Sequence, residues 1–83
     1  MQIFVKPANI IKNNKMLNTL TFFVNKNELI SSLFEKIRNR LDLSVGIYLI
    51  YAGKCLEENR RVNDYFIMEN STIILNVRTI LNN

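Results

Sequence analysis

The sequence predicts an α+β domain in which one amphipathic helix packs across one face of a mixed sheet of four or five strands. Three observations predict this fold. Residues 1–24 contain two runs with the two-residue period of a strand, residues 30–41 switch to helical spacing, and two later runs are rich in branched and aromatic residues. We expect one domain over residues 1–78 and a tail over residues 79–83.

The amino-terminal segment is predicted to form a hairpin. Its two strands cover residues 1–5 and 20–24, and each places alternate apolar residues on one face. The residues on that face are Met1, Ile3, Val5, Leu20, Phe22 and Val24. The connection between the strands is long, and Asn13 and Asn14 are its expected tip.

A helix is predicted to follow the hairpin. Apolar residues recur at steps of three and four, which is the spacing of one helical face: Ile30, Leu33, Ile37 and Leu41. We expect Asn25 to be the N-cap of this helix, and Glu28 three residues later completes a capping-box pair. The apolar stripe is interpreted as a core-facing surface.

The second half of the chain is predicted to contain two more sheet strands and one short helical turn. A strand over residues 47–51 leads into a turn at Ala52 and Gly53. A polar loop follows, residues 64–67 are long enough for one helical turn, and the last strand covers residues 72–78. On that strand Ile73, Leu75 and Val77 share one face, and Ile74, Asn76 and Arg78 share the other.

The amino-acid composition argues against several kinds of function. The net charge is +4, but the basic residues are scattered, so a nucleic-acid partner is not expected. Cys55 is the single cysteine and there is no histidine, which excludes an internal disulfide and a cysteine-protease dyad and argues against a zinc site. We therefore expect no enzymatic activity and no cofactor, and a reducing location in the cytoplasm or nucleus. The sequence has no apolar run that could span a membrane.

Four short segments occur in the order and spacing of one known family. They are MQIFVK at residues 1–6, LIYAGKCLE at residues 49–57, VNDY at residues 62–65 with Ile67, and STI at residues 71–73 with Leu75. Together they resemble ubiquitin from Met1 to about Arg78, and this family has the β-grasp fold. Two lengths differ, because the first hairpin loop is longer and the segment after the helix is one residue shorter.

The resemblance implies a recognition surface and no catalytic site. The family's central isoleucine matches Ile50, and parity places Tyr48 and Ile74 beside it if Leu49 and Ile73 face the helix. The family usually has a basic residue, a histidine and a valine where this chain has Tyr48, Ile74 and Asn76. The resemblance also implies that Gly53 forms the turn and that the Tyr65 hydroxyl holds the preceding loop. The predicted binding residues are Tyr48, Ile50, Gly53, Lys54, Ile74, Asn76, Ile10 and Ile11.

Two alternatives remain open at the rim of this predicted surface. The long hairpin loop carries Ile10, Ile11, Met16 and Leu17, and it could either contact a partner or cover Tyr48 and Ile74. Lys6 and Lys54 match lysines that the family uses as acceptors in chain building, and they could equally be solvated surface lysines.

The end of the sequence bears on conjugation. Conjugated members of the family terminate in two glycines, whereas this sequence ends at Asn83 and its only glycines are Gly46 and Gly53. We therefore expect a monomeric, non-conjugating interaction domain of the ubiquitin–proteasome system, either free-standing or the amino-terminal module of a larger protein. Its expected partners are ubiquitin-binding domains or proteasomal receptors. The alternative is a structural subunit that uses the fold as a docking scaffold.

Overall fold

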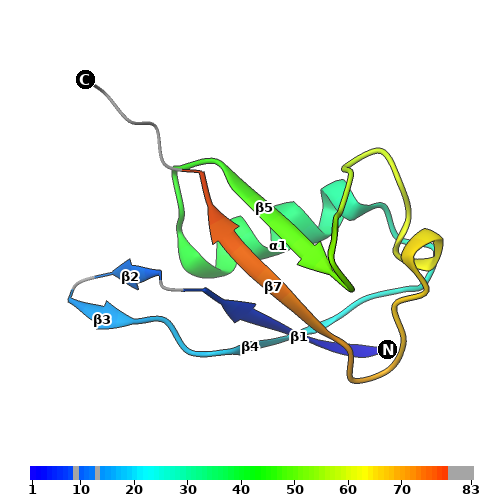
Figure 1. Ribbon diagram of the computed structural model, residues 1–83, viewed down its shortest axis with the longest axis horizontal. Coiled ribbons are helices and arrows are strands. Elements are labelled where there is room, and N and C mark those ends of the chain that lie inside the picture. The colour runs from blue at the N-terminus through cyan, green and yellow to red at the C-terminus, as the bar shows by residue number, and fades with distance from the viewer. Residues whose placement is uncertain (9, 13, 79–83) are drawn as a thin grey trace.

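Five strands form one mixed sheet in the order β4-β1-β7-β5-β6 (Figure 1). The computed structural model describes residues 1–8, 10–12 and 14–78. The strands of this sheet are β1 (Gln2–Pro7), β4 (Leu20–Phe23), β5 (Ile47–Tyr51), β6 (Lys54–Cys55) and β7 (Thr72–Val77). β1 runs parallel to β7, and the other pairs are antiparallel. The predicted α+β fold is confirmed.

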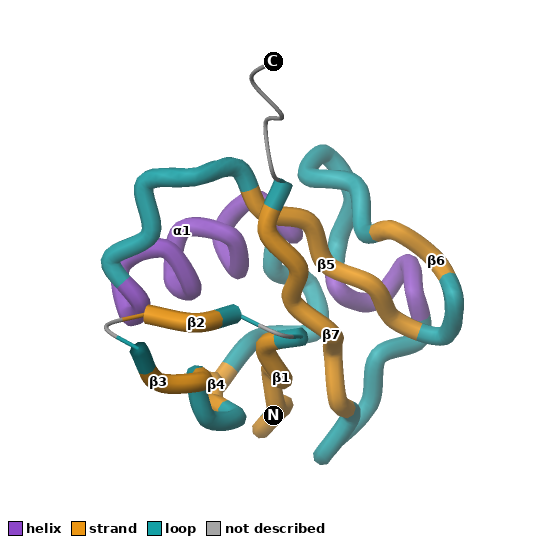
Figure 2. The backbone as a smooth tube through the Cα atoms, turned by 60° about the vertical axis from the view of Figure 1, so that its left-hand side comes forward, coloured by secondary structure: helices purple, strands orange, loops and turns teal. Residues whose placement is uncertain are grey.

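Helix α1 (Ile30–Leu41) packs across one face of the sheet, as Figure 2 shows. The apolar stripe predicted for this helix supplies its buried side, apart from Leu41, which is partly buried. On the facing strands the alternate residues are buried: Ile3, Val5, Phe22, Ile47, Leu49, Ile73 and Leu75. The prediction of which residues of β1, β4 and β7 share the apolar face is therefore correct. The core lies between that face of the sheet and α1.

The predicted N-cap of the helix is wrong. Asn25 lies five residues before the first helical residue, Ile30, and Leu29 occupies the cap position in extended conformation with no side-chain cap. The backbone N–H of Ile30 donates instead to the carbonyl oxygen of Arg60 at 2.8 Å. Glu28 does accept a hydrogen bond from the N–H of Asn25 at 3.1 Å, so the predicted pair forms a turn that precedes the helix. A backbone carbonyl of a neighbouring loop thus accepts a hydrogen bond from the first turn of the helix, where the sequence predicted a capping side chain.

The long connection between β1 and β4 forms a second, two-stranded hairpin. Its strands are β2 (Ile11–Lys12) and β3 (Lys15–Met16), and they pair antiparallel. Asn14 has a positive φ of 64°, which suits the predicted tip, whereas Asn13 lies outside the described residues. This hairpin, named here the inserted hairpin (residues 11–16), extends to one side of β7 and β5 in both views (Figures 1 and 2).

The short helical turn starts two residues earlier than periodicity predicts. It is the 3₁₀ helix η1 (Val62–Tyr65), which matches the bounds implied by the resemblance and not the predicted residues 64–67. The N–H of Arg61 donates to the Asp64 carboxylate at 2.8 Å and opens the turn. Phe66 then adopts a left-handed conformation with φ 57° and ends it. No helix in the described part of the chain is long and apolar enough to cross a membrane.

Candidate protein-interaction face

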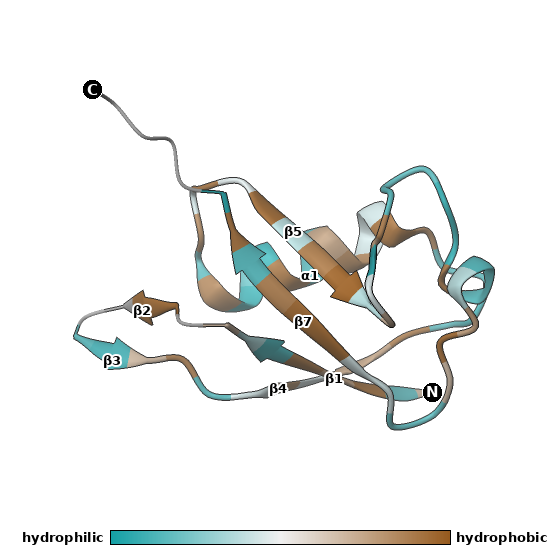
Figure 3. Ribbon diagram, in the orientation of Figure 1, coloured by the Kyte–Doolittle hydropathy of each residue, from teal (hydrophilic) through white to brown (hydrophobic). Residues whose placement is uncertain are grey.

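Four of the predicted binding residues meet on the side of the sheet that faces away from α1. Ile50 on β5 pairs directly with Ile74 on β7, and Tyr48 pairs with Asn76. All four are half-buried, whereas the residues between them on each strand are buried against the helix. Figure 3 shows hydrophobic residues along most of both strands. We call these four residues the open face.

Strand register adds two residues to the border of the open face. Lys6 on β1 lies opposite Ile74, and Cys55 on β6 lies opposite Ile50. Both are exposed, and Cys55 is a free thiol. The sequence analysis did not include Cys55 among the predicted binding residues. The two-residue turn was the signal that could have placed it, because such a turn sets which residues of a hairpin face each other.

A cation lies at one end of the open face. The guanidinium carbon of Arg78 is 5.3 Å from the centroid of the Tyr48 ring, within the range of a cation–π contact. The N–H of Arg78 also donates to the carbonyl oxygen of Gly46 at 2.7 Å, which ties the backbone there to the start of β5. The open face is therefore apolar at its centre, with Lys6 and Arg78 as basic groups at its border.

The turn between β5 and β6 borders the open face. Ala52 and Gly53 have φ values of 52° and 77°, the left-handed pair that a tight hairpin turn requires. Gly53 is thus needed for its backbone conformation. Lys54 is exposed but pairs with Tyr51, whose side chain packs against the core. Lys54 consequently has the parity of the helix side, and Cys55 is the residue of β6 that shares a face with Ile50.

The loop after β6 is held as the resemblance implies. The N–H of Glu57 donates to the Tyr65 hydroxyl at 2.7 Å. The same loop offers the carbonyl oxygen of Glu58 to the N–H of Ser31 at 3.1 Å, beside the contact from Arg60 described above. Tyr65 therefore fixes a loop that in turn satisfies the first backbone donors of α1.

A comparison with protein families agrees with this arrangement of turn, loop and face. The model described as the ubiquitin family matches residues 3–80. The chain belongs to the ubiquitin family. A comparison with curated proteins found no match. The family resemblance inferred from the four sequence segments is thereby confirmed over nearly the whole chain.

The inserted hairpin is the largest departure of this ubiquitin-family domain from the expected pattern. Ile10 was predicted as a binding residue, but it is only 5% exposed and belongs to the core. Ile11 is 67% exposed and lines a hollow of about 360 Å³ with residues 42–45 and Val77. Val77 lies on the same side of β7 as Ile73, which faces the helix, so the structure places both Ile10 and Ile11 away from the open face. The described lining of the hollow beside Ile11 includes no residue of the open face.

Two charged groups with shifted pKa values lie near the start of α1 in this ubiquitin-family domain. Burial pushes the pKa of Glu28 upward, but hydrogen bonds from Lys36, Ser32 and the backbone of Asn25 outweigh it and hold the pKa below its ordinary value. On the facing loop, the carboxylate of Glu57 raises the pKa of the exposed Arg60. These contacts help to order the helix start and its loop, and they are separate from the open face.

Proposed function

We propose that this ubiquitin-family domain is a non-conjugating interaction module that presents the open face to ubiquitin-binding domains or proteasomal receptors. The observation that carries the proposal is the direct pairing of Ile50 with Ile74 on the side of the sheet that the helix does not cover. Apolar side chains gathered on an accessible face mark contact sites more often than scattered ones. The module acts by binding, with no catalytic step of its own.

The border residues support recognition of a particular receptor. Tyr48 and Ile74 make the face more apolar than the basic and histidine positions of the family pattern, and Arg78 restores a cation beside Tyr48. A face of this size gives a small interface, for which we expect a micromolar dissociation constant, about −8 kcal/mol of binding free energy. The exposed thiol of Cys55 suits the reducing cytoplasm or nucleus, where we place the function.

The proposed lack of conjugation concerns the residues directly after β7 and needs its own test. They are Arg78, Thr79, Ile80, Leu81, Asn82 and Asn83, and none of them is a glycine. A glycine pair passes through narrow enzyme channels because it has no side chain that could collide there. Incubation of the chain with ATP and ubiquitin-activating enzyme should give no thioester on a non-reducing gel, while ubiquitin in the parallel reaction does. A thioester band from this chain would contradict the proposal.

The binding proposal is tested by an amide-resolved NMR titration against a panel of ubiquitin-associated domains, ubiquitin-interacting helices and proteasomal receptor domains. We expect shifts centred on Tyr48, Ile50 and Ile74. Ile50→Ala should weaken binding by at least about tenfold, which is about 1.4 kcal/mol, without unfolding the domain. Ile11→Ala is the control, because it truncates an exposed isoleucine that lies away from the open face. Equal losses in both variants, or no shift on the open face, would overturn the assignment.

A second candidate function is a structural subunit that docks through the inserted hairpin. The observation that favours it is the exposed cross-strand pair of Ile11 and Met16, with Val45 exposed nearby. Size-exclusion chromatography separates the two functions. A stable monomer supports the interaction module, whereas association that Ile11→Lys with Met16→Lys abolishes supports the subunit.

A further inference from the structure

The ladder between β5 and β7 continues beyond the last residue of β7. Ile47 pairs with Val77, so the next pair in the antiparallel register is Gly46 with Arg78. The N–H of Arg78 donates to the carbonyl oxygen of Gly46 at 2.7 Å, as this pairing requires. A Cβ atom at position 46 would lie 3.5 Å from the Cβ of Arg78, so the two residues face each other on one side of the sheet. Arg78 is therefore paired in the manner of a strand residue.

The segment that precedes β5 has backbone groups ready for a further pair. Residues of an antiparallel ladder alternate between those whose backbone groups point to the partner strand and those whose groups point away. Gly46 bonds to Arg78, so Val45 points away from β7 and Ser44 points toward the same side as Gly46. The carbonyl oxygen of Val45 accordingly accepts a hydrogen bond from the Arg38 guanidinium of α1 at 3.0 Å. Within the described part of the chain, the backbone of Ser44 has no hydrogen-bond partner.

The hollow of about 360 Å³ beside the inserted hairpin adjoins this segment. Its lining includes Ile11, Val77 and residues 42–45. Ile11 is 67% exposed and Val45 is 45% exposed, so apolar surface at this hollow is accessible. Leu43 and Val77 both pack against the core, which places them on the helix side of the ladder. A residue paired with Leu43 would share that side and would point toward the hollow.

The sequence after β7 has an apolar residue with the required spacing. Alternate positions after Val77 are Thr79 and Leu81, whereas Ile80 has the opposite parity, that of Arg78. A strand advances about 3.3 Å per residue, so Leu81 can reach about 13 Å beyond Val77. These residues belong to the same chain, which gives them a high effective concentration at the hollow relative to a separate partner.

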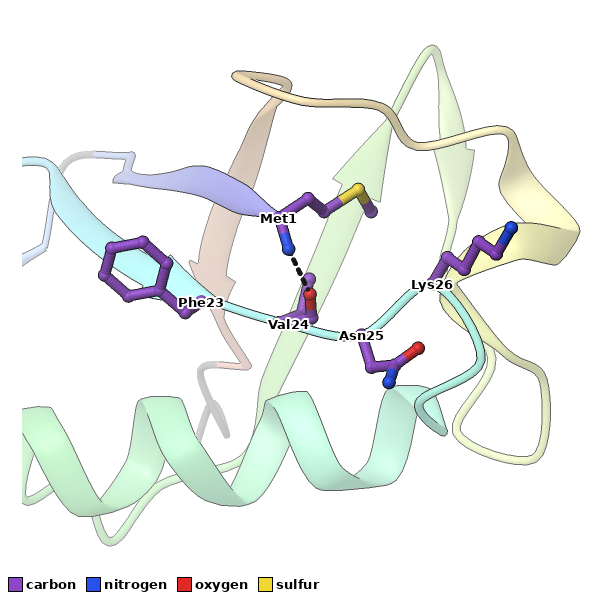
Figure 4. A pocket seen from close by; sticks show the side chains of 5 residues that line it. All are labelled: Met1, Phe23, Val24, Asn25 and Lys26. Carbon is purple, nitrogen blue, oxygen red and sulfur yellow. Dashed lines mark hydrogen bonds between the residues drawn. The ribbon is translucent and has the colours of Figure 1, made fainter.

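The hollow near the amino terminus is out of reach for the same segment. It has a volume of about 460 Å³ and is lined by Met1, Phe23 and Lys26 among others (Figure 4). β1 runs parallel to β7, so Met1 lies near the start of β7 and Val77 lies at its other end (Figure 1). The hollow beside the inserted hairpin is instead lined by Val77 itself.

We propose that residues 79–81 continue β7 along residues 43–45 and that Leu81 fills the hollow beside the inserted hairpin. Ser44 and Ile80 form the next bonded pair and exchange both N–H···O=C hydrogen bonds. Leu81 covers the exposed apolar side chains that line the hollow. The tail is thus an intramolecular cover for the apolar surface at the inserted hairpin, and a partner that binds this surface has to displace it. This role goes beyond binding by the open face.

NMR of the 83-residue chain tests the pairing directly. We expect a nuclear Overhauser effect between the Hα atoms of Val45 and Thr79, because residues of a non-bonded antiparallel pair lie close together. The amides of Ser44 and Ile80 should exchange with solvent at least about tenfold more slowly than their intrinsic rates. Absence of the contact between Val45 and Thr79, or exchange of both amides at intrinsic rates, overturns the proposal.

Side-chain variants test which residue occupies the hollow. Leu81→Ser removes the apolar group and should abolish the slow exchange of Ser44, whereas Ile80→Ser makes a similar change on the opposite parity and should retain it. Leu81→Ser should also increase the fluorescence of anilinonaphthalene sulfonate, a dye that binds exposed apolar surface. Equal effects of the two variants on the exchange of Ser44 would contradict the assignment of Leu81 to the hollow.

Proline variants test the backbone pairing separately from the side chains. Ile80→Pro removes the N–H that bonds to the carbonyl oxygen of Ser44, whereas Thr79→Pro removes an N–H that points away from this segment. The first variant should bring exchange at Ser44 close to its intrinsic rate, and the second should keep it at least about tenfold slower. Slow exchange at Ser44 in the Ile80→Pro chain would show that another group protects this amide, and the strand extension would be wrong.

Failure of this proposal is distinguishable from failure of the proposed function. Ile50→Ala alters the open face and should leave the exchange of Ser44 unchanged. Leu81→Ser should leave the affinity for an open-face receptor unchanged. If Leu81→Ser instead weakens that receptor as much as Ile50→Ala does, the tail belongs to the open face and its assignment to the hollow is wrong.

Discussion

Ile73 and Ile74 are the same residue type one position apart in β7, yet they lie in opposite environments. Ile73 is fully buried between the sheet and α1, whereas Ile74 is half-buried on the open face beside Ile50. Folding constrains the first, because a buried side chain must fit its neighbours closely. The second is only partly removed from water, so close packing constrains it less. The helix side of this domain therefore encodes the fold, and the open side is available for recognition.

The largest expected effect is on the helix side. Ile73→Ala should lower the free energy of unfolding by about 3 kcal/mol, because it removes buried methylene and methyl groups and leaves a cavity beside Leu75. Urea unfolding followed by circular dichroism measures the loss. A loss of unfolding free energy below about 1 kcal/mol would contradict the full burial of Ile73 between the sheet and α1.

The loop that supports the helix side should show a smaller effect. Tyr65→Phe removes the hydroxyl that accepts the N–H of Glu57, and we expect a loss of about 1 kcal/mol, since the exposed N–H can turn to water. Hydrogen exchange should rise at the amides of Ile30 and Ser31, because their acceptors lie in the released loop. Unchanged exchange at those two amides would show that the loop is held by other contacts.

The contacts of the Glu28 carboxylate near the start of α1 lead to a prediction that depends on pH. Glu28 has a lowered pKa in the folded domain, so its contribution to stability is complete above the ordinary carboxyl pKa and is lost as the pH falls through the folded value. Glu28→Gln should cost about 0.5 to 1 kcal/mol at neutral pH, discounted because the Lys36 amine is partly exposed. The difference from the unmodified domain should shrink toward zero in acid below about pH 4.

The control for this prediction lies on α1, the helix that also carries Lys36. Glu35→Gln changes an exposed carboxylate and should alter stability little at any pH. A Glu28→Gln deficit that persists unchanged in acid would contradict the assigned contacts with Lys36 and Ser32.

The smallest expected effect on stability belongs to the open face. Ile74→Ala should cost less than about 1 kcal/mol, because the side chain is only partly removed from water. The same variant should nevertheless weaken binding to an open-face receptor, as measured by calorimetry. Ile73→Ala and Ile74→Ala thus form a matched pair, and similar stability losses in the two would remove the basis for treating the open face as a recognition surface.

Much of the fold could be predicted from periodicity. The two-residue period of β1, β4 and β7 and the helical stripe of α1 each identify a buried side, and the structure confirms them. The N-cap assigned to Asn25 failed because the donor of Ile30 is satisfied by Arg60, which is distant in sequence. Local patterns carry no information on such a contact, since it exists only when the loop packs against the helix.

The candidate face was also predicted in part. Parity and the family resemblance together placed Tyr48, Ile50 and Ile74 on one side, and the structure brings them together. Ile10 was assigned to the same surface, but it lies just before the inserted hairpin and packs into the core. An apolar residue in a long loop has no periodicity from which its direction could be inferred.

The sequence by itself determined which residues alternate, where the helical stripe lies and to which family the chain belongs. Those properties depend on residue types that recur at fixed short spacings along the sequence, so they can be recognised without knowing the fold. The tertiary structure decided that Cys55 and Lys6 border Ile50 and Ile74, that Ile10 is buried, and that a hollow adjoins the inserted hairpin. These features depend on strand register and on packing between distant segments, which decide whether each side chain is buried in the core or stays accessible.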